Sequence, residues 1–169
     1  GLIGQYAHGN EPSHHMAYLY NSSGRPEKSQ FMVNKILNEL YHSSPSGISG
    51  NEDCGQMSSW YVLSAIGLYD INPGDPYYVI QTPYVEESSL NLENGKVFSI
   101  KKIESGGENS IYINKVELSG KPYNKNYIHI NDVIQGGELQ IYTTSDSSKK
   151  WQLDEFYTSS IKNDVITIN

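Results

Sequence analysis

The residues best suited to chemistry lie in two short segments that mix acids and amides beside glycines. Residues 8–15 read His-Gly-Asn-Glu-Pro-Ser-His-His, and residues 50–61 open Gly-Asn-Glu-Asp-Cys-Gly-Gln. Within them, Asn10-Glu11 and Asn51-Glu52-Asp53 supply three carboxylates and two carboxamides. These oxygens suit a hard cation such as Ca²⁺. Two of the carboxyl groups would equally serve as the acid and the base of a glycoside hydrolase.

Each of these residues also has a purely structural interpretation. Asp53, followed three residues later by Gln56, matches a capping box at the start of a helix. Glu11 precedes a proline-initiated helix, where a negative charge is favoured by the helix dipole. His14 and His15 are adjacent, so on a helix they point about 100° apart and at most one of them faces a site. The residue types alone therefore leave capping and chemistry both open.

Three helices are expected to position these segments, over residues 12–21, 26–42 and 54–68. Pro12 and Pro26 have the fixed φ that suits the first turn of a helix. The second helix has one apolar face at helical spacing, made by Val33, Ile36, Leu37, Leu40 and Tyr41. Three helices form a thin core, so we expect them to pack on a sheet or on further helices.

After the turn at residues 72–76 the pattern changes to alternation with a period of two. Six strands are predicted, at residues 77–82, 88–92, 97–103, 110–118, 127–130 and 138–143, and residues 165–168 are expected to form either a last strand or a docked terminus. The fold class is therefore α+β, with a helical segment followed by an antiparallel, sandwich-like β segment. We place the boundaries at 1–72 for the helical segment, 73–145 for the β segment and 146–169 for a linker and tail.

Composition excludes several classes of partner. The net charge of −7 and the absence of a Lys/Arg cluster argue against nucleic acid and against an anionic membrane surface. No apolar run approaches twenty residues, so neither a membrane span nor a signal peptide is expected. Zinc is disfavoured because no His/Cys spacing matches a zinc site, and the single cysteine, Cys54, is interpreted as a small buried residue.

Several motifs in the same order resemble the C-terminal part of a family 92 glycoside hydrolase. They are residues 8–15, 18–20, 25–30, 50–61 and 72–78, and the resemblance extends from residue 1 to about residue 145. Members of this family are bacterial α-mannosidases that commonly act on α-1,2 linkages. The resemblance implies an (α/α)₆ barrel preceded by a β-sandwich, a Ca²⁺ ion bound directly to the sugar, and inversion at the anomeric carbon.

The resemblance also implies roles for individual residues. Asp53 matches the catalytic base and is assisted by Asn51, a position where some members carry Asp. Glu11 and Asn10 match the calcium-binding segment, and His14, Glu52 and Asn10 are expected to contact substrate. The general acid belongs to an earlier motif that nothing in these 169 residues matches.

The sequence is thus interpreted as the C-terminal portion of a periplasmic or secreted bacterial exo-α-mannosidase, inactive by itself. Its expected partners are a mannose-containing glycan and the upstream part of the same polypeptide, and exposed apolar helix faces make self-association an additional expectation. Two alternatives remain: a carbohydrate-binding module that uses its tyrosines, and a structural module without a ligand.

Overall fold

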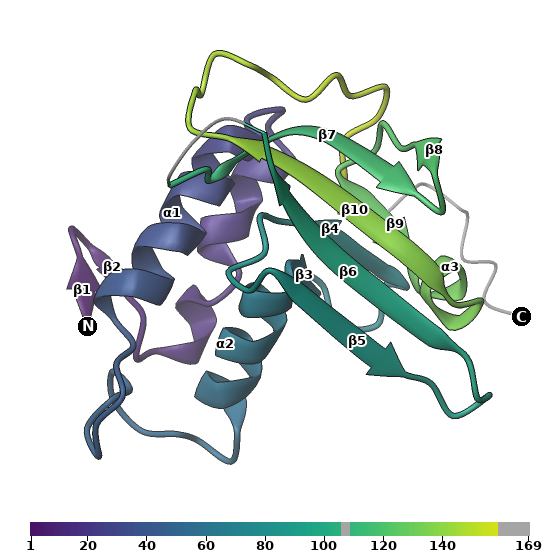
Figure 1. Ribbon diagram of the computed structural model, residues 1–169. Coiled ribbons are helices and arrows are strands. Elements are labelled where there is room, and N and C mark those ends of the chain that lie inside the picture. Colours follow the sequence, from purple (N-terminus) through teal and green to yellow (C-terminus); the bar gives the residue numbers. More distant parts are fainter. Residues whose placement is uncertain (106–108, 159–169) are drawn as a thin grey trace, which may run out of the picture.

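A helical layer packs against two β-sheets in the computed structural model, which describes residues 1–105 and 109–158 (Figure 1). Helix α1 (Pro26–Glu39) starts at its proline, as expected, and ends three residues before the predicted boundary. Val33, Ile36 and Leu37 are buried on one side of it. The predicted apolar face is therefore the face that packs on the rest of the protein.

The chain before α1 is less helical than its sequence predicts. A small hairpin, β1 (Leu2–Ile3) and β2 (Tyr6–Ala7), leads into two 3₁₀ turns, η1 (Glu11–Ser13) and η2 (Met16–Asn21). The single helix expected at 12–21 is therefore wrong. The buried Asn21 amide donates a hydrogen bond to the carbonyl of Tyr18 at 2.9 Å. This side-chain bond to a backbone carbonyl of η2 ends the 3₁₀ turn. Such side-chain bonds to the backbone compete with helical ones.

Five strands form the larger sheet, in the order β5-β6-β10-β7-β8. Their bounds are Glu87–Asn91 (β5), Val97–Glu104 (β6), Tyr112–Leu118 (β7), Lys121–Pro122 (β8) and Gly137–Thr144 (β10). The predicted strands are present, but the expectation of a purely antiparallel arrangement is wrong, because β10 runs parallel to β6. Strands β6 and β7 follow each other in the sequence but are not neighbours in the sheet. After α3 (Ile130–Ile134) the chain returns as β10, which lies between them and runs antiparallel to β7.

The smaller sheet consists of β3 (Leu68–Tyr69), β4 (Tyr77–Ile80) and β9 (Tyr127–His129), all antiparallel. It shares one apolar core with the larger sheet. That core contains Leu68, Ile80, Phe98, Ile100, Ile113, Val116, Ile128, Val133, Leu139, Ile141 and Trp151. Trp151 shows that the segment after β10 folds back onto the sheets; the last strand or docked terminus expected at 165–168 lies outside the described residues.

A second core joins the helices to the smaller sheet, as the thin helical layer required. It gathers Ala17, Tyr18, Val33, Ile36, Leu37, Trp60, Tyr69, Val79 and Tyr157. Polar bonds cross the same boundary: the buried Gln30 of α1 accepts a hydrogen bond from the backbone N–H of Ile113 in β7 at 3.1 Å. Among residues 1–105 and 109–158, no helix has the length and apolar character needed to cross a bilayer.

Candidate functional site

A close backbone contact brings the two polar segments together. A Cβ atom on Gly9 would lie 2.4 Å from the carbonyl oxygen of Ser49, and one on Gly50 would lie 3.2 Å from the carbonyl oxygen of Gly9. Gly50 also has a φ of +92°, which side chains rarely adopt. Glycine at both positions therefore allows two loops forty residues apart in sequence to touch.

His14 lies at the centre of this contact between residues 8–15 and residues 50–61, which we call the joint. Its ring Nε2 donates a hydrogen bond to the carbonyl of His8 at 2.9 Å, and its Nδ1 accepts one from the Gln56 side-chain amide at 3.0 Å. The indole Nε1 of Trp60 donates to the carbonyl of His14 at 3.0 Å. His14 and Trp60 are almost completely buried. One histidine thus connects the first segment to the second through its ring and through its backbone.

A second buried histidine lies beneath it. His8 Nδ1 is 2.8 Å from the Tyr6 hydroxyl, and its Nε2 is 2.6 Å from the Tyr41 hydroxyl. Tyr41 in turn donates to the carbonyl of Met57 at 3.2 Å. Because Tyr41 uses its proton on that carbonyl, it accepts from His8 Nε2–H, and Tyr6 donates to Nδ1. Burial, with the nearby His14, lowers the pKa of His8 to about 4, so the ring is neutral around pH 7.

The two carboxyl groups at the surface of this joint form a pair. Glu11 and Asp53 are exposed, and their side chains are close enough to share a hydrogen bond. This bond, with some desolvation and the negative charge of Glu11, raises the pKa of Asp53. The pKa of Glu11 is lowered by its own backbone N–H and by Asp53. Of the two groups, Asp53 is the one that holds a proton more readily.

The backbone at Asp53 is unusual. Asp53 and Cys54 have φ values of +51° and +58°, and Gly55 follows at +98°. Left-handed residues other than glycine carry strain and cluster at functional sites. Helix α2 (Gln56–Ile66) begins only after this turn, two residues later than expected.

The predicted capping box is wrong, because Asp53 does not occupy the N-cap position. Gly55 does, with no side-chain bond of its own. The Glu52 carboxylate supplies the cap instead, since its Oε1 accepts from the backbone N–H of Ser58 at 3.1 Å. Asp53 is thereby left free of a capping role. The expectation of a buried Cys54 is also wrong, because the turn exposes that side chain.

The remaining predicted residues lie close by in the chain. Asn10 and Asn51 are exposed, each adjacent in sequence to the carboxyl-bearing residues of its segment, and His15 is partly exposed. No cluster of three or more Asp, Glu, His or Cys side chains within residues 1–105 and 109–158 is arranged to hold a metal ion. The Glu11 and Asp53 carboxyls are oxygen donors of the kind Ca²⁺ prefers, but they supply only part of its six to eight ligands.

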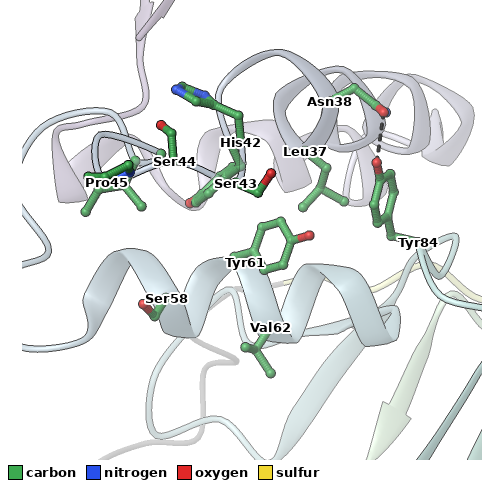
Figure 2. A pocket seen from close by; sticks show the side chains of 13 residues that line it. Leu37, Asn38, His42, Ser43, Ser44, Pro45, Ser58, Tyr61, Val62 and Tyr84 are labelled. Atoms are coloured by element: carbon green, nitrogen blue, oxygen red, sulfur yellow. Dashed lines mark hydrogen bonds between the residues drawn. The ribbon is translucent and has the colours of Figure 1, made fainter.

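A cavity of about 660 Å³ opens between α1, α2 and the loop that joins them (Figure 2). Leu37, Tyr61 and Val62 line it, and Tyr84 closes one side by donating a hydrogen bond to Asn38 at 3.0 Å. Val62 is 55% exposed. The carboxyl pair does not line this cavity, so its apolar wall and the chemical groups are separate features.

Sequence reasoning did not identify Gln56, Tyr6 or Tyr41 as part of the site. Gln56 was predicted only to be the second residue of a capping box with Asp53. The available signal is spacing: His14 follows Glu11 by three residues and Gln56 follows Asp53 by three, which places each on the turn that carries its carboxyl.

Comparison with known proteins decides the family. The sequence profile of the glycosyl hydrolase family 92 catalytic domain matches residues 1–145. The chain belongs to glycosyl hydrolase family 92. The family 92 α-mannosidase BT3965 from Bacteroides thetaiotaomicron is 36% identical over 86% of this chain, with a TM-score of 0.81. The family 92 inverting mannosidase BT2199 from the same organism is 38% identical over 88% of the chain, with a TM-score of 0.78.

A third relative of this family 92 chain is an uncharacterized secreted glycosidase from Arthroderma benhamiae, 32% identical over 85% of the chain. The 169 residues span about one fifth of each relative, namely 20%, 20% and 19% of their lengths. The chain is therefore part of a family 92 catalytic domain, and its mixed α+β fold matches the part of the two α-mannosidase structures that it covers.

Proposed function

We propose that the chain is the C-terminal part of a calcium-dependent, inverting exo-α-mannosidase that removes terminal mannose from glycans, with a preference for α-1,2 linkages. The observation that carries the proposal is the Glu11–Asp53 carboxyl pair, held at the junction of two segments in a family 92 chain. The mannoimidazole complex of the relative BT3965 supports a mannose-like ligand.

In this proposal Asp53 is the general base. A base works best when its pKa lies nearer the working pH, and in the calcium-free chain the hydrogen bond shared with Glu11 raises the pKa of Asp53 in that direction. Asp53 takes the proton from the attacking water, and the Asn51 amide, two residues back, orients that water. The strained turn holds the Asp53 carboxyl at the surface, where a water and a sugar reach it.

Glu11 is not the general acid. An inverting glycosidase needs its acid and base about 6.5 to 9.5 Å apart, so that sugar and water fit between them. Glu11 is too close to Asp53, because the two side chains share a hydrogen bond. The acid is therefore assigned to the upstream part of the polypeptide, which is the first partner of this chain.

Glu11 and Asn10 are assigned to the calcium ion. A bound Ca²⁺ would hold vicinal hydroxyls of the terminal mannose and favour distortion of its ring. Glu52 caps α2 through Oε1, which leaves Oε2 for a sugar hydroxyl. His14 stays a predicted substrate contact, but both of its ring nitrogens already have partners, so it would reach a hydroxyl only by giving up Gln56.

The cellular location and the protein contacts of the intact enzyme are part of the same proposal. We place the intact protein in the periplasm or outside the cell, since its glycan substrate lies there and one relative is described as secreted. The open wall of the cavity between α1 and α2 is the face through which the chain would contact the upstream region or a second copy of itself.

Melting of the isolated chain in a calcium titration, with and without mannose, tests the proposal. Calcium should raise the melting temperature, mannose should raise it further only when calcium is present, and Glu11→Gln should remove both effects. Glu93→Gln, in an exposed turn, is the matched control. A melting temperature indifferent to calcium would refute calcium binding, and sugar binding that needs tyrosines but not Glu11 would indicate a carbohydrate-binding module.

Hydrolysis is tested separately. The isolated chain should not cleave an α-mannoside, because its acid lies elsewhere. Measurable cleavage that Asp53→Asn abolishes would show that the acid is within these residues after all.

A further inference from the structure

The bond between Gln56 and His14 connects the two carboxyl-bearing turns at equivalent places. His14 follows Glu11 by three residues and Gln56 follows Asp53 by three. A hydrogen bond of 3.0 Å from the Gln56 amide to His14 Nδ1 therefore joins the residue three positions after Asp53 to the residue three positions after Glu11. We infer that Gln56 and His14 are positioning residues that hold the segment carrying Asp53 against the segment carrying Glu11. This inference rests on the proposed function of the carboxyl pair.

The chemistry of the bond fixes its direction. The carbonyl oxygen of His8 can only accept, so His14 Nε2 carries the proton that bonds to it at 2.9 Å. In the neutral ring Nδ1 then has a lone pair, and the Gln56 side chain must present its NH₂ group to it. The buried His14 ring is thus held at both nitrogens, and only Gln56 connects it to the second segment by a side-chain bond to the ring.

The two segments that carry Glu11 and Asp53 need a bond of this kind to keep the carboxyl groups together. When both carboxyls are ionised they lose their shared hydrogen bond and repel each other, and the strained turn at 53–55 begins α2 without a side-chain bond from its own N-cap residue. Two other contacts hold the same segments together, one on each side of the carboxyls in the sequence. Gly9 and Gly50 touch before the carboxyls, and Trp60 bonds to the backbone of His14 after them.

The single cysteine provides a direct test. Cys54 is exposed and adjacent to Asp53, so a nitroxide label there reports how close the first segment lies. In the calcium-free chain the label should broaden the amide signals of Asn10 and Glu11. Gln56→Leu, similar in size but unable to bond, should weaken this broadening while the rest of the spectrum is unchanged. Gln152→Leu, on an exposed residue of the tail, is the matched control.

A conservative variant separates the bond from mere packing. Gln56→Glu offers an acceptor where the wild type offers a donor, so His14 must carry a proton on Nδ1 as well. The ¹⁵N shifts of the His14 ring should report that change, while the broadening at Asn10 and Glu11 is retained. If Gln56→Leu does not fold, Gln56→Ser, which is too short to reach His14, takes its place with the same expected loss.

Unchanged broadening in Gln56→Leu, or an unchanged His14 ring in Gln56→Glu, would overturn the inference. Calcium affinity provides the link to function: Gln56→Leu should weaken calcium binding, because the segment that carries Asp53 is then held less firmly against the segment that carries Glu11. A chain that binds no calcium would contradict the proposed function, whereas the calcium-free broadening would still decide the role of Gln56.

Discussion

Replacing Gly9 by alanine tests the contact on which the site depends. The new Cβ would lie 2.4 Å from the carbonyl oxygen of Ser49 and 3.1 Å from its carbonyl carbon. Both are backbone atoms, so the neighbour cannot turn aside as a flexible side chain would. Relieving the clash requires the loops to separate by roughly 1 Å, which for overpacked sites costs about 1–3 kcal/mol.

The expected result is a loss of about 2 kcal/mol in the free energy of unfolding, measured by urea titration. For a protein of this size that corresponds to a fall of about 4–8 °C in melting temperature. Gly95→Ala is the control, because nothing lies within 4 Å of its Cβ and only its φ of +78° adds strain. A Gly9→Ala variant within about 0.5 kcal/mol of the wild type, the range of ordinary surface substitutions, would refute the close approach of the two segments.

Three further predictions concern buried polar groups. The folded-state pKa of His8, about 4, is below the ordinary value of 6.5, so as the pH falls the unfolded chain binds the proton first. The free energy of unfolding should therefore decrease by at most about 3 kcal/mol as the pH is lowered from 6.5 to 4. In urea titrations His8→Asn should flatten this pH dependence. Trp60→Phe leaves the carbonyl of His14 without its donor and should cost about 1–3 kcal/mol in the same assay, whereas full stability would argue against the bond. Gln30→Leu removes the acceptor of the Ile113 N–H and should speed hydrogen exchange at that amide; unchanged exchange would show that the bond does not join α1 to the sheet.

The carboxyl pair illustrates how the fold serves the proposed chemistry. Neither segment contains a ready-made site, since each contributes one member of the pair and the two are joined through a buried histidine. In the proposed function, the acid that completes an inverting mechanism faces this pair from the upstream part of the polypeptide. The exposed apolar wall between α1 and α2 is consistent with a chain whose relatives are about five times longer.

Much of the fold follows from local pattern. The apolar period of α1 predicts its buried face, and the alternation after residue 76 predicts β4, β5, β6, β7, β9 and β10, whereas the two-residue strands β3 and β8 were not predicted. The parallel pairing of β10 with β6 does not follow from alternation, because strand direction depends on where the connecting segments run. The two 3₁₀ turns were likewise missed, since Asn21 and the packing of Tyr18 override helix propensity there.

The sequence by itself determined the family and named the candidate site residues, because rare motifs in a fixed order carry that information. Only the tertiary structure decided how those residues meet. It gave the helix cap to Glu52, freed Asp53 to pair with Glu11, and assigned Gln56 to His14. The physical reason is that these contacts join segments about forty residues apart, and their geometry depends on the packing of the whole chain between them.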